Sequence, residues 1–137
     1  MNQKALHSGF TLIELMMVIG IVAILAIVAA GFYGDNVIAA KRSDGRRGLQ
    51  DTATSLEKCK SLYGTYNSAN CAIADGSTVP SPEGLYDIAV TTAASTFSLT
   101  ATPSAGSSQN ADTDCTSMTL DNLGQRGGTG ADASVCW

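Results

Sequence analysis

Positive charge, histidine and room for a second core are all scarce in this sequence. Its 137 residues allow one modest domain, and eight lysines and arginines against twelve acids leave a net charge of −4. That balance argues against nucleic acid held by bulk electrostatics. The one histidine is His7, and no two cysteines are spaced as Cys-x-x-Cys. The short ligand spacing of a zinc site is therefore missing, and we expect no metal and no other cofactor.

A long apolar segment dominates what is present. Residues 15–33 form an unbroken run of 19 apolar residues. As a helix that rises about 1.5 Å per residue, the run is about 28 Å long, close to the hydrocarbon thickness of a bilayer. A helical pattern then continues to about Leu62, so we expect one long helix from about Phe10 to Leu62.

The second half of this helix is predicted to be amphipathic. Its apolar stripe consists of Leu49, Ala53, Leu56, Lys60 (through its aliphatic stem) and Tyr63. The opposite face carries Arg46, Arg47, Gln50, Asp51 and Glu57. Gly45 and Gly48 should weaken this half by about 1 kcal/mol each relative to alanine.

The rest of the chain alternates between loops and short strands. Residues 64–84, 104–113 and 123–134 are rich in turn formers and are expected to be loops. The alternating runs are Tyr86 to Val90, Phe97 to Ala101, and Met118 to Leu120. Period-two alternation predicts half-buried antiparallel strands. We therefore expect an α+β fold: a long N-terminal helix, transmembrane in its first half, whose amphipathic half packs on a C-terminal antiparallel sheet of three to four strands.

The four cysteines are Cys59, Cys71, Cys115 and Cys136. An even count behind an apolar N-terminal segment predicts two disulfides, formed in an oxidising compartment after export. Three pairings are possible. We favour Cys59–Cys71, which would join the last turn of the helix to the loop that returns from it, and Cys115–Cys136, which would clamp the end of the chain.

Glu14 is anomalous at the start of the apolar segment. A carboxylate deep in a bilayer costs on the order of 2.5–3.5 kcal/mol. The helix dipole would offset only roughly 0.3–1 kcal/mol of that cost. A chain that keeps such an acid needs a partner for it, and the nearest candidate is an α-amino group, created if the chain is cut just before Phe10.

The segment Gly9-Phe10-Thr11-Leu12-Ile13-Glu14, with the apolar run behind it, resembles the class III signal sequence of type IV pilins and related pseudopilins. The resemblance implies that a prepilin peptidase cuts between Gly9 and Phe10 and methylates the new amine of Phe10. It also implies that Glu14 pairs with the Phe10 amine of a neighbouring subunit and sets the register of a helical filament.

This resemblance divides the chain into a leader at residues 1–9, a membrane and filament-core helix at residues 10–33, and a globular domain at residues 34–137. The precursor is expected in the inner membrane, and the mature protein in the pilus on the surface of a Gram-negative bacterium. The implied partners are other pilin subunits and the prepilin peptidase. Two alternatives stay open: an ordinary secretory signal cut after Ala30, which the acid at position 14 fits poorly, and an anchor that is never processed.

The C-terminal half is similar to the minor pilins of Pseudomonas-type pilus systems. The similarity runs from FSLTATP through Cys115 and SMTLDNLGQRG to Cys136-Trp137. Gly31 departs from the many pilins that have proline there, and Cys59 and Cys71 are an additional pair, as in neisserial pilins of the competence type. We expect a minor pilin that helps to assemble a type IV pilus, with adhesion, twitching motility and DNA uptake as roles of the whole system.

Two rival functions are a competence pilin that acts as a DNA receptor and a pseudopilin of type II secretion. A basic cluster just beyond the apolar segment contains Lys41, Arg42, Arg46 and Arg47. In a filament it would lie near the core, poorly placed for DNA. Lys58 and Lys60 are more accessible, but Glu57 is beside them. Residues 110–137 have four acids against one arginine, Arg126. DNA is therefore the disfavoured partner.

Catalysis is not expected. Cutting after Gly9 removes His7, and disulfides would occupy all four cysteines. Serine- and threonine-rich loops without a base are ordinary turns. The acid pair Asp112 and Asp114 is typical of a polar loop or a weak cation site. We assign no catalytic residue.

Overall fold

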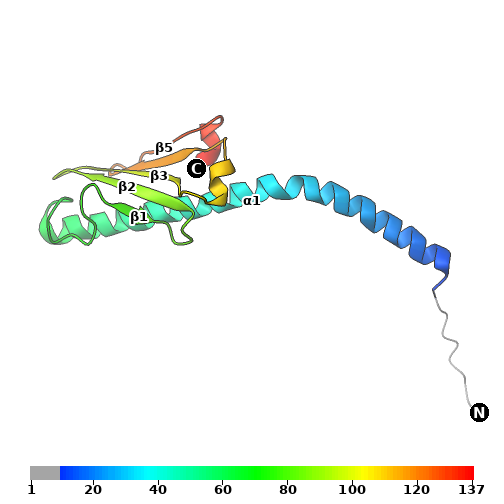
Figure 1. The fold of residues 1–137 in the computed structure, drawn as a ribbon. Helices are drawn as coiled ribbons and strands as arrows, with labels where there is room; N and C mark the ends of the chain where they lie inside the picture. The colour runs from blue at the N-terminus through cyan, green and yellow to red at the C-terminus, as the bar shows by residue number, and fades with distance from the viewer. Residues whose placement is uncertain (1–9) are drawn as a thin grey trace, which may run out of the picture. The chain divides into compact units, whose positions relative to one another are not determined.

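The computed structural model describes residues 10–137, which form one long helix followed by an antiparallel sheet (Figure 1). The elements are α1 (Leu12–Tyr63), β1 (Thr78–Pro80), β2 (Tyr86–Thr92), β3 (Phe97–Pro103), β4 (Ser117–Asp121) and β5 (Arg126–Thr129), with two 3-10 turns, η1 (Ser108–Ala111) and η2 (Ala133–Cys136). The predicted fold class is confirmed, although the sheet has five strands rather than three to four. The predicted leader, residues 1–9, lies outside the described part of the chain.

The chain divides into two compact units, Met1–Asn36 and Val37–Trp137. In the first unit, the stretch Leu12–Ala29 of α1 has a mean hydropathy of 2.9, and none of it is buried. By length and composition this stretch could cross a membrane. The second unit contains every buried hydrophobic residue of the described chain, so it has a core of its own.

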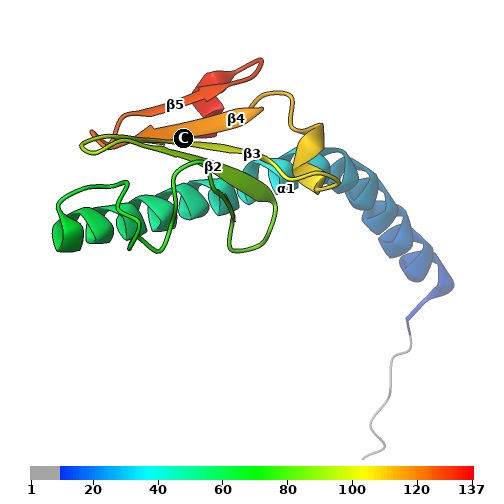
Figure 2. The ribbon, with the colours of Figure 1, turned by 60° about the vertical axis from the view of Figure 1, so that its left-hand side comes forward.

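The sheet of the second unit is a meander in which each strand pairs with the next (Figure 2). The predicted apolar positions of the strands are all buried: Tyr86, Ile88, Val90, Phe97, Leu99, Ala101, Met118 and Leu120. The register sets Val90 opposite Leu99, and Leu99 opposite Leu120. Because side chains alternate along a strand, these in-register residues share one face of the sheet. Together with Leu49 and Leu56 of α1 they form the hydrophobic core.

Strands β1 and β5 lie in segments that the sequence predicts to be loops. Their sequences, Thr-Val-Pro and Arg-Gly-Gly-Thr, show no apolar alternation. Each is defined by backbone pairing, with Val79 opposite Ile88 and Met118 opposite Gly128. A Cβ atom at Gly128 would lie 2.6 Å from Cys136 Sγ, so glycine lets the end of the chain pack on β5.

The buried face of α1 differs from the predicted stripe at its C-terminal end. Leu49 and Leu56 are fully buried, but Tyr63 is 48% exposed. The helix ends at Tyr63, and Gly64 turns the chain back with a φ of 77°, a conformation that favours glycine. Tyr66 then fills the core position, with its ring edge-on to Phe97 and the centroids 5.1 Å apart.

Gly45 and Gly48 are sites of close approach between α1 and the sheet, and not merely weak points of the helix. A Cβ atom at Gly45 would collide with the side chain of Met118. One at Gly48 would lie 2.6 Å from Ile88 Cδ1 and 3.2 Å from the backbone of Ser81. Interiors are packed too closely to absorb such overlap freely, so these glycines set the distance between helix and sheet.

Candidate functional site

The start of α1 is capped by Thr11. Its hydroxyl accepts a hydrogen bond from the backbone N–H of Glu14 at 3.3 Å. The sequence Thr-Leu-Ile-Glu follows the Ser/Thr-x-x-Glu capping pattern, a signal that the sequence analysis missed. Within the described residues, the Glu14 carboxylate makes no hydrogen bond or ion pair, so the cap uses its backbone and leaves its charge unpaired.

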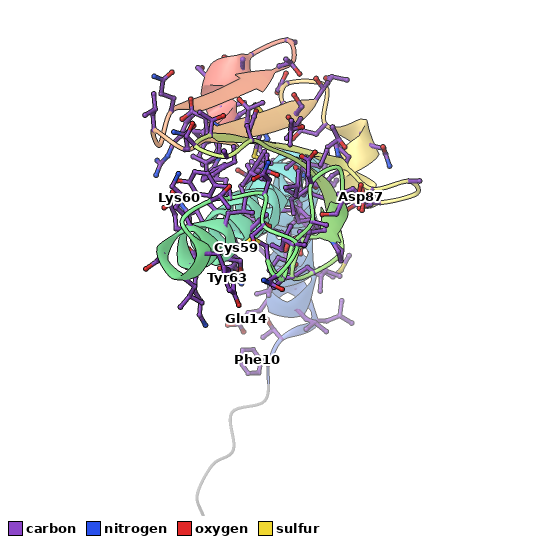
Figure 3. The ribbon with its side chains drawn as sticks, turned by 90° about the vertical axis from the view of Figure 1, so that its left-hand side faces the viewer. Phe10, Glu14, Cys59, Lys60, Tyr63 and Asp87 are labelled. Atoms are coloured by element: carbon purple, nitrogen blue, oxygen red, sulfur yellow. A yellow bond between two sulfur atoms is a disulfide. The ribbon has the colours of Figure 1, made fainter. Side chains whose placement is uncertain are left out.

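Phe10 lies just before α1, and Glu14 lies in its first turn (Figure 3). Phe10 is 84% exposed, and the apolar side chains that follow are exposed all round the helix. The exposed residues include Leu12, Ile13, Leu15, Met16, Met17, Val18, Ile19, Ile21, Val22, Ile24, Leu25, Ile27 and Val28. A helix that is apolar on every side is stable only in lipid or among other helices. Gly9, the other residue of the predicted cleavage site, lies outside the described residues.

The structure brings together the two cysteine pairs that the sequence analysis favours. Cys59 at the end of α1 is bonded to Cys71, with the Cα atoms 5.4 Å apart. Cys115 before β4 is bonded to Cys136 in η2, with the Cα atoms 5.3 Å apart. The first bond ties the loop after α1 to the helix, and the second ties the end of the chain to the sheet.

Two arginines of the basic cluster beyond the apolar segment, Arg42 and Arg46, make hydrogen bonds within the protein. Arg42 donates to both carboxylate oxygens of Asp112, from Nε at 2.6 Å and from Nη2 at 2.7 Å. Arg46 donates to the carbonyl oxygens of Cys136 at 2.8 Å and Val135 at 3.1 Å. The two arginines therefore hold the C-terminal segment against α1. Arg46 was predicted on the open face of the helix, but it is half-buried by this contact.

Asp112 is buried, and hydrogen bonds from Arg42 hold the pKa of its carboxyl below the ordinary value. The Cys115 backbone N–H also donates to it, at 3.1 Å. Its neighbour Asp114 is exposed and lies 3.9 Å from the Arg42 guanidinium. The acid pair thus includes one structural member, which sequence spacing alone did not reveal. Among the described residues, no three His, Cys, Asp or Glu side chains gather as a metal site.

The end of α1 and the loop after it form a segment without acids, residues 58–74, which we call the stapled segment because Cys59–Cys71 closes it. Its charges are Lys58, which is exposed and unpaired within the described residues, and Lys60. Lys60 Nζ lies 4.6 Å from the centre of the Tyr66 ring and donates to the carbonyl oxygen of Ala94 at 3.1 Å. Figure 3 shows Cys59, Lys60 and Tyr63 at this end of the helix.

Glu57, which the sequence places beside these lysines, is engaged elsewhere. Its carboxylate accepts a hydrogen bond from the Tyr66 hydroxyl at 2.8 Å. Burial raises the pKa of the Tyr66 hydroxyl, and the hydrogen bond to Glu57 raises it further, so tyrosine stays the donor at neutral pH. Among the described residues, Glu57 makes no ion pair with either lysine, so Lys58 remains available to an anion.

Two family models match the chain. One, described as "Prokaryotic N-terminal methylation motif", matches residues 4–30. The other, described as "Type IV minor pilin ComP, DNA uptake sequence receptor", matches residues 32–119, more than half of the chain.

Among solved structures, a type IV pilin from Shewanella oneidensis is similar to this chain at 29% sequence identity and a TM-score of 0.50. The match covers 73% of this chain and 97% of that one. None of the curated proteins matches the chain.

Proposed function

We propose that this chain, which belongs to the family of the type IV minor pilin ComP, is cut between Gly9 and Phe10 and built into a pilus through Glu14. As a member of this family, it is a membrane-anchored precursor that later lies on the pilus surface. Family and fold are those of structural proteins. The match of the methylation motif to residues 4–30 carries the proposal, since this range contains the Gly9–Phe10 junction.

The geometry at the start of α1 supports the assembly step. The exposed apolar helix requires lipid before assembly and neighbouring helices after it. The unpaired Glu14 carboxylate, four residues after Phe10 in the sequence, would be costly among those helices unless a cation meets it. A methylated amine on Phe10 of an adjacent subunit is such a cation. Each subunit would then offer one amine and one carboxylate to its neighbours.

The processing step is tested by the mass of the mature N-terminus. In protein from sheared pili, we expect a first residue of N-methylated Phe10, without residues 1–9. Gly9→Val should abolish cleavage because a branched side chain crowds the peptidase site, and Ser8→Val is the matched control at the neighbouring position. A mature chain that begins at Gly31 would instead identify an ordinary secretory signal.

A second function, DNA binding, gains support from the family description, which names a DNA uptake sequence receptor. The matched range includes the whole stapled segment. Two observations favour this segment: Glu57 makes no ion pair with Lys58 or Lys60 among the described residues, and no acid lies among residues 58–74. We propose that DNA binds there, with Lys58 and Lys60 on its phosphates.

The salt dependence of DNA binding tests this second function. The unit Val37–Trp137 carries its own core and both disulfides, so it can be studied as a soluble protein. Two phosphate contacts predict a slope of about −1.8 for log K against log salt, which Lys58→Ala should reduce to about −0.9. Fluorescence anisotropy with a labelled duplex measures it. Arg47→Ala, an exposed arginine outside the segment, should leave the slope unchanged. An unchanged slope in Lys58→Ala would place DNA elsewhere.

A further inference from the structure

A hollow of about 230 Å³ lies beside the Cys59–Cys71 bond, between the last turns of α1 and the returning loop. Its lining residues are Ser55, Lys58, Cys59, Leu62, Tyr63, Asn70, Cys71 and Ala72. The disulfide therefore fixes the two walls to each other. The hollow is smaller than the pockets of about 300–1,000 Å³ that hold drug-sized ligands, so it suits one planar ring rather than an extended molecule.

Three side chains of the lining offer different interactions. Tyr63 is 48% exposed and presents part of its ring to the solvent. The Asn70 side chain and the Lys58 ammonium make no hydrogen bond or ion pair with any other described residue. The lining contains an aromatic ring, an amide with donors and an acceptor, and a cation, but no carboxylate. This chemistry is wrong for a metal ion and fits a planar polar ring linked to an anion.

We propose that this hollow holds one unpaired nucleobase of a bound DNA strand, stacked on Tyr63 and hydrogen-bonded to Asn70, with its phosphate on Lys58. The inference rests on the proposed DNA-binding function. Aromatic side chains bind bases of single strands by stacking, whichever base is present. Two lysines alone provide little phosphate attraction, so stacking supplies the larger part of the affinity.

A preference for unpaired bases follows from this mode of binding. A base inside a duplex reaches the hollow only after it leaves the stack, and that step costs free energy. A single strand, or a duplex with an unpaired tail, offers its bases without this cost. The unit should therefore bind these two DNAs more tightly than a blunt duplex of the same sequence.

The experiment compares a short single strand, a tailed duplex and a blunt duplex by fluorescence anisotropy with the oxidised unit Val37–Trp137. Tyr63→Ala should weaken binding of the single strand and the tailed duplex by about 5- to 150-fold, the range for one stacked base, and leave the blunt duplex nearly unchanged. Tyr63→Phe should retain the affinity, because the ring remains. Leu123→Ala, an exposed apolar residue in the turn between β4 and β5, is the matched control and should change nothing.

The possible results separate the inference from the function on which it rests. Equal affinity for the three DNAs, or an unchanged affinity of Tyr63→Ala for single strands, overturns the base site and leaves DNA binding standing. Absence of binding to every DNA overturns both. Circular dichroism and thermal unfolding of Tyr63→Ala show whether the variant keeps its fold, which we expect because Tyr63 is the partly exposed last residue of α1.

Discussion

Asp112→Ala is expected to lower the free energy of unfolding of the unit Val37–Trp137 by about 3–5 kcal/mol. The Arg42 side chain is only 8% exposed and bonds both oxygens of Asp112. Without the carboxylate, the guanidinium stays buried with two weak contacts, the Val135 carbonyl oxygen at 3.5 Å and the exposed Asp114 carboxylate at 3.9 Å. Urea unfolding of wild type and variant measures the difference.

The matched control for this prediction is Asp114→Ala. The Asp114 side chain is 60% exposed and 3.9 Å from Arg42, so its removal should cost at most about 1 kcal/mol. Equal losses in the two variants would mean that the buried pair has no special weight. The double variant Arg42→Met, Asp112→Leu removes both charges and should recover most of the stability, because no buried charge is left unpaired.

The same pair predicts an acid-dependent stability. The pKa of Asp112 is lower in the folded state than in the unfolded chain, where it is about 3.9. Its stabilising contribution is therefore complete above that value and is lost as the pH falls through the lower, folded-state pKa. The gap in stability between wild type and Asp112→Ala should shrink over this range. A gap that stays constant below pH about 3.9 would contradict the assignment.

Glu14→Ala is expected to reach the membrane and be cleaved normally but to enter the pilus poorly. Membrane insertion should persist because the substitution removes an acid whose burial costs on the order of 2.5–3.5 kcal/mol. The cap at Thr11 should persist too, since it uses the backbone N–H of residue 14 and not the side chain. Assembly should fail because the Phe10 amine would lack its carboxylate, a loss of about 3–5 kcal/mol for a broken buried pair.

The abundance of each variant in membranes and in sheared pili measures this effect. Glu14→Gln is the matched control for shape, because it keeps the size of the side chain and removes only the charge; it should also be excluded from pili. Thr11→Ala removes the cap and keeps the acid, so it should be incorporated. Normal incorporation of Glu14→Ala would show that another contact brings this subunit into the filament.

The local periodicity of the sequence was sufficient to predict α1 and the apolar sides of β2, β3 and β4. A helix repeats its contacts every three or four residues and a strand every two, so Leu49, Leu56, Ile88 and Leu99 could be placed inside from their neighbours alone. The pairing of the four cysteines could be favoured from the predicted elements, because each bond joins an element to the segment that returns beside it.

The tertiary structure decided the features that the periodicity of the sequence cannot predict. Strands β1 and β5 form because a neighbouring strand offers backbone donors and acceptors. The two glycines of β5 have no side chains, so they give no apolar alternation from which a strand could be predicted. Arg42 finds Asp112 across 70 residues of chain, and nothing near either residue marks it as buried. From the sequence, Gly48 is predicted only to weaken the helix. In the structure, Ile88 and Ser81 lie so close to it that a side chain at this position would overlap them. Pairing across the fold depends on which surfaces meet, and that is set only once helix and sheet have packed.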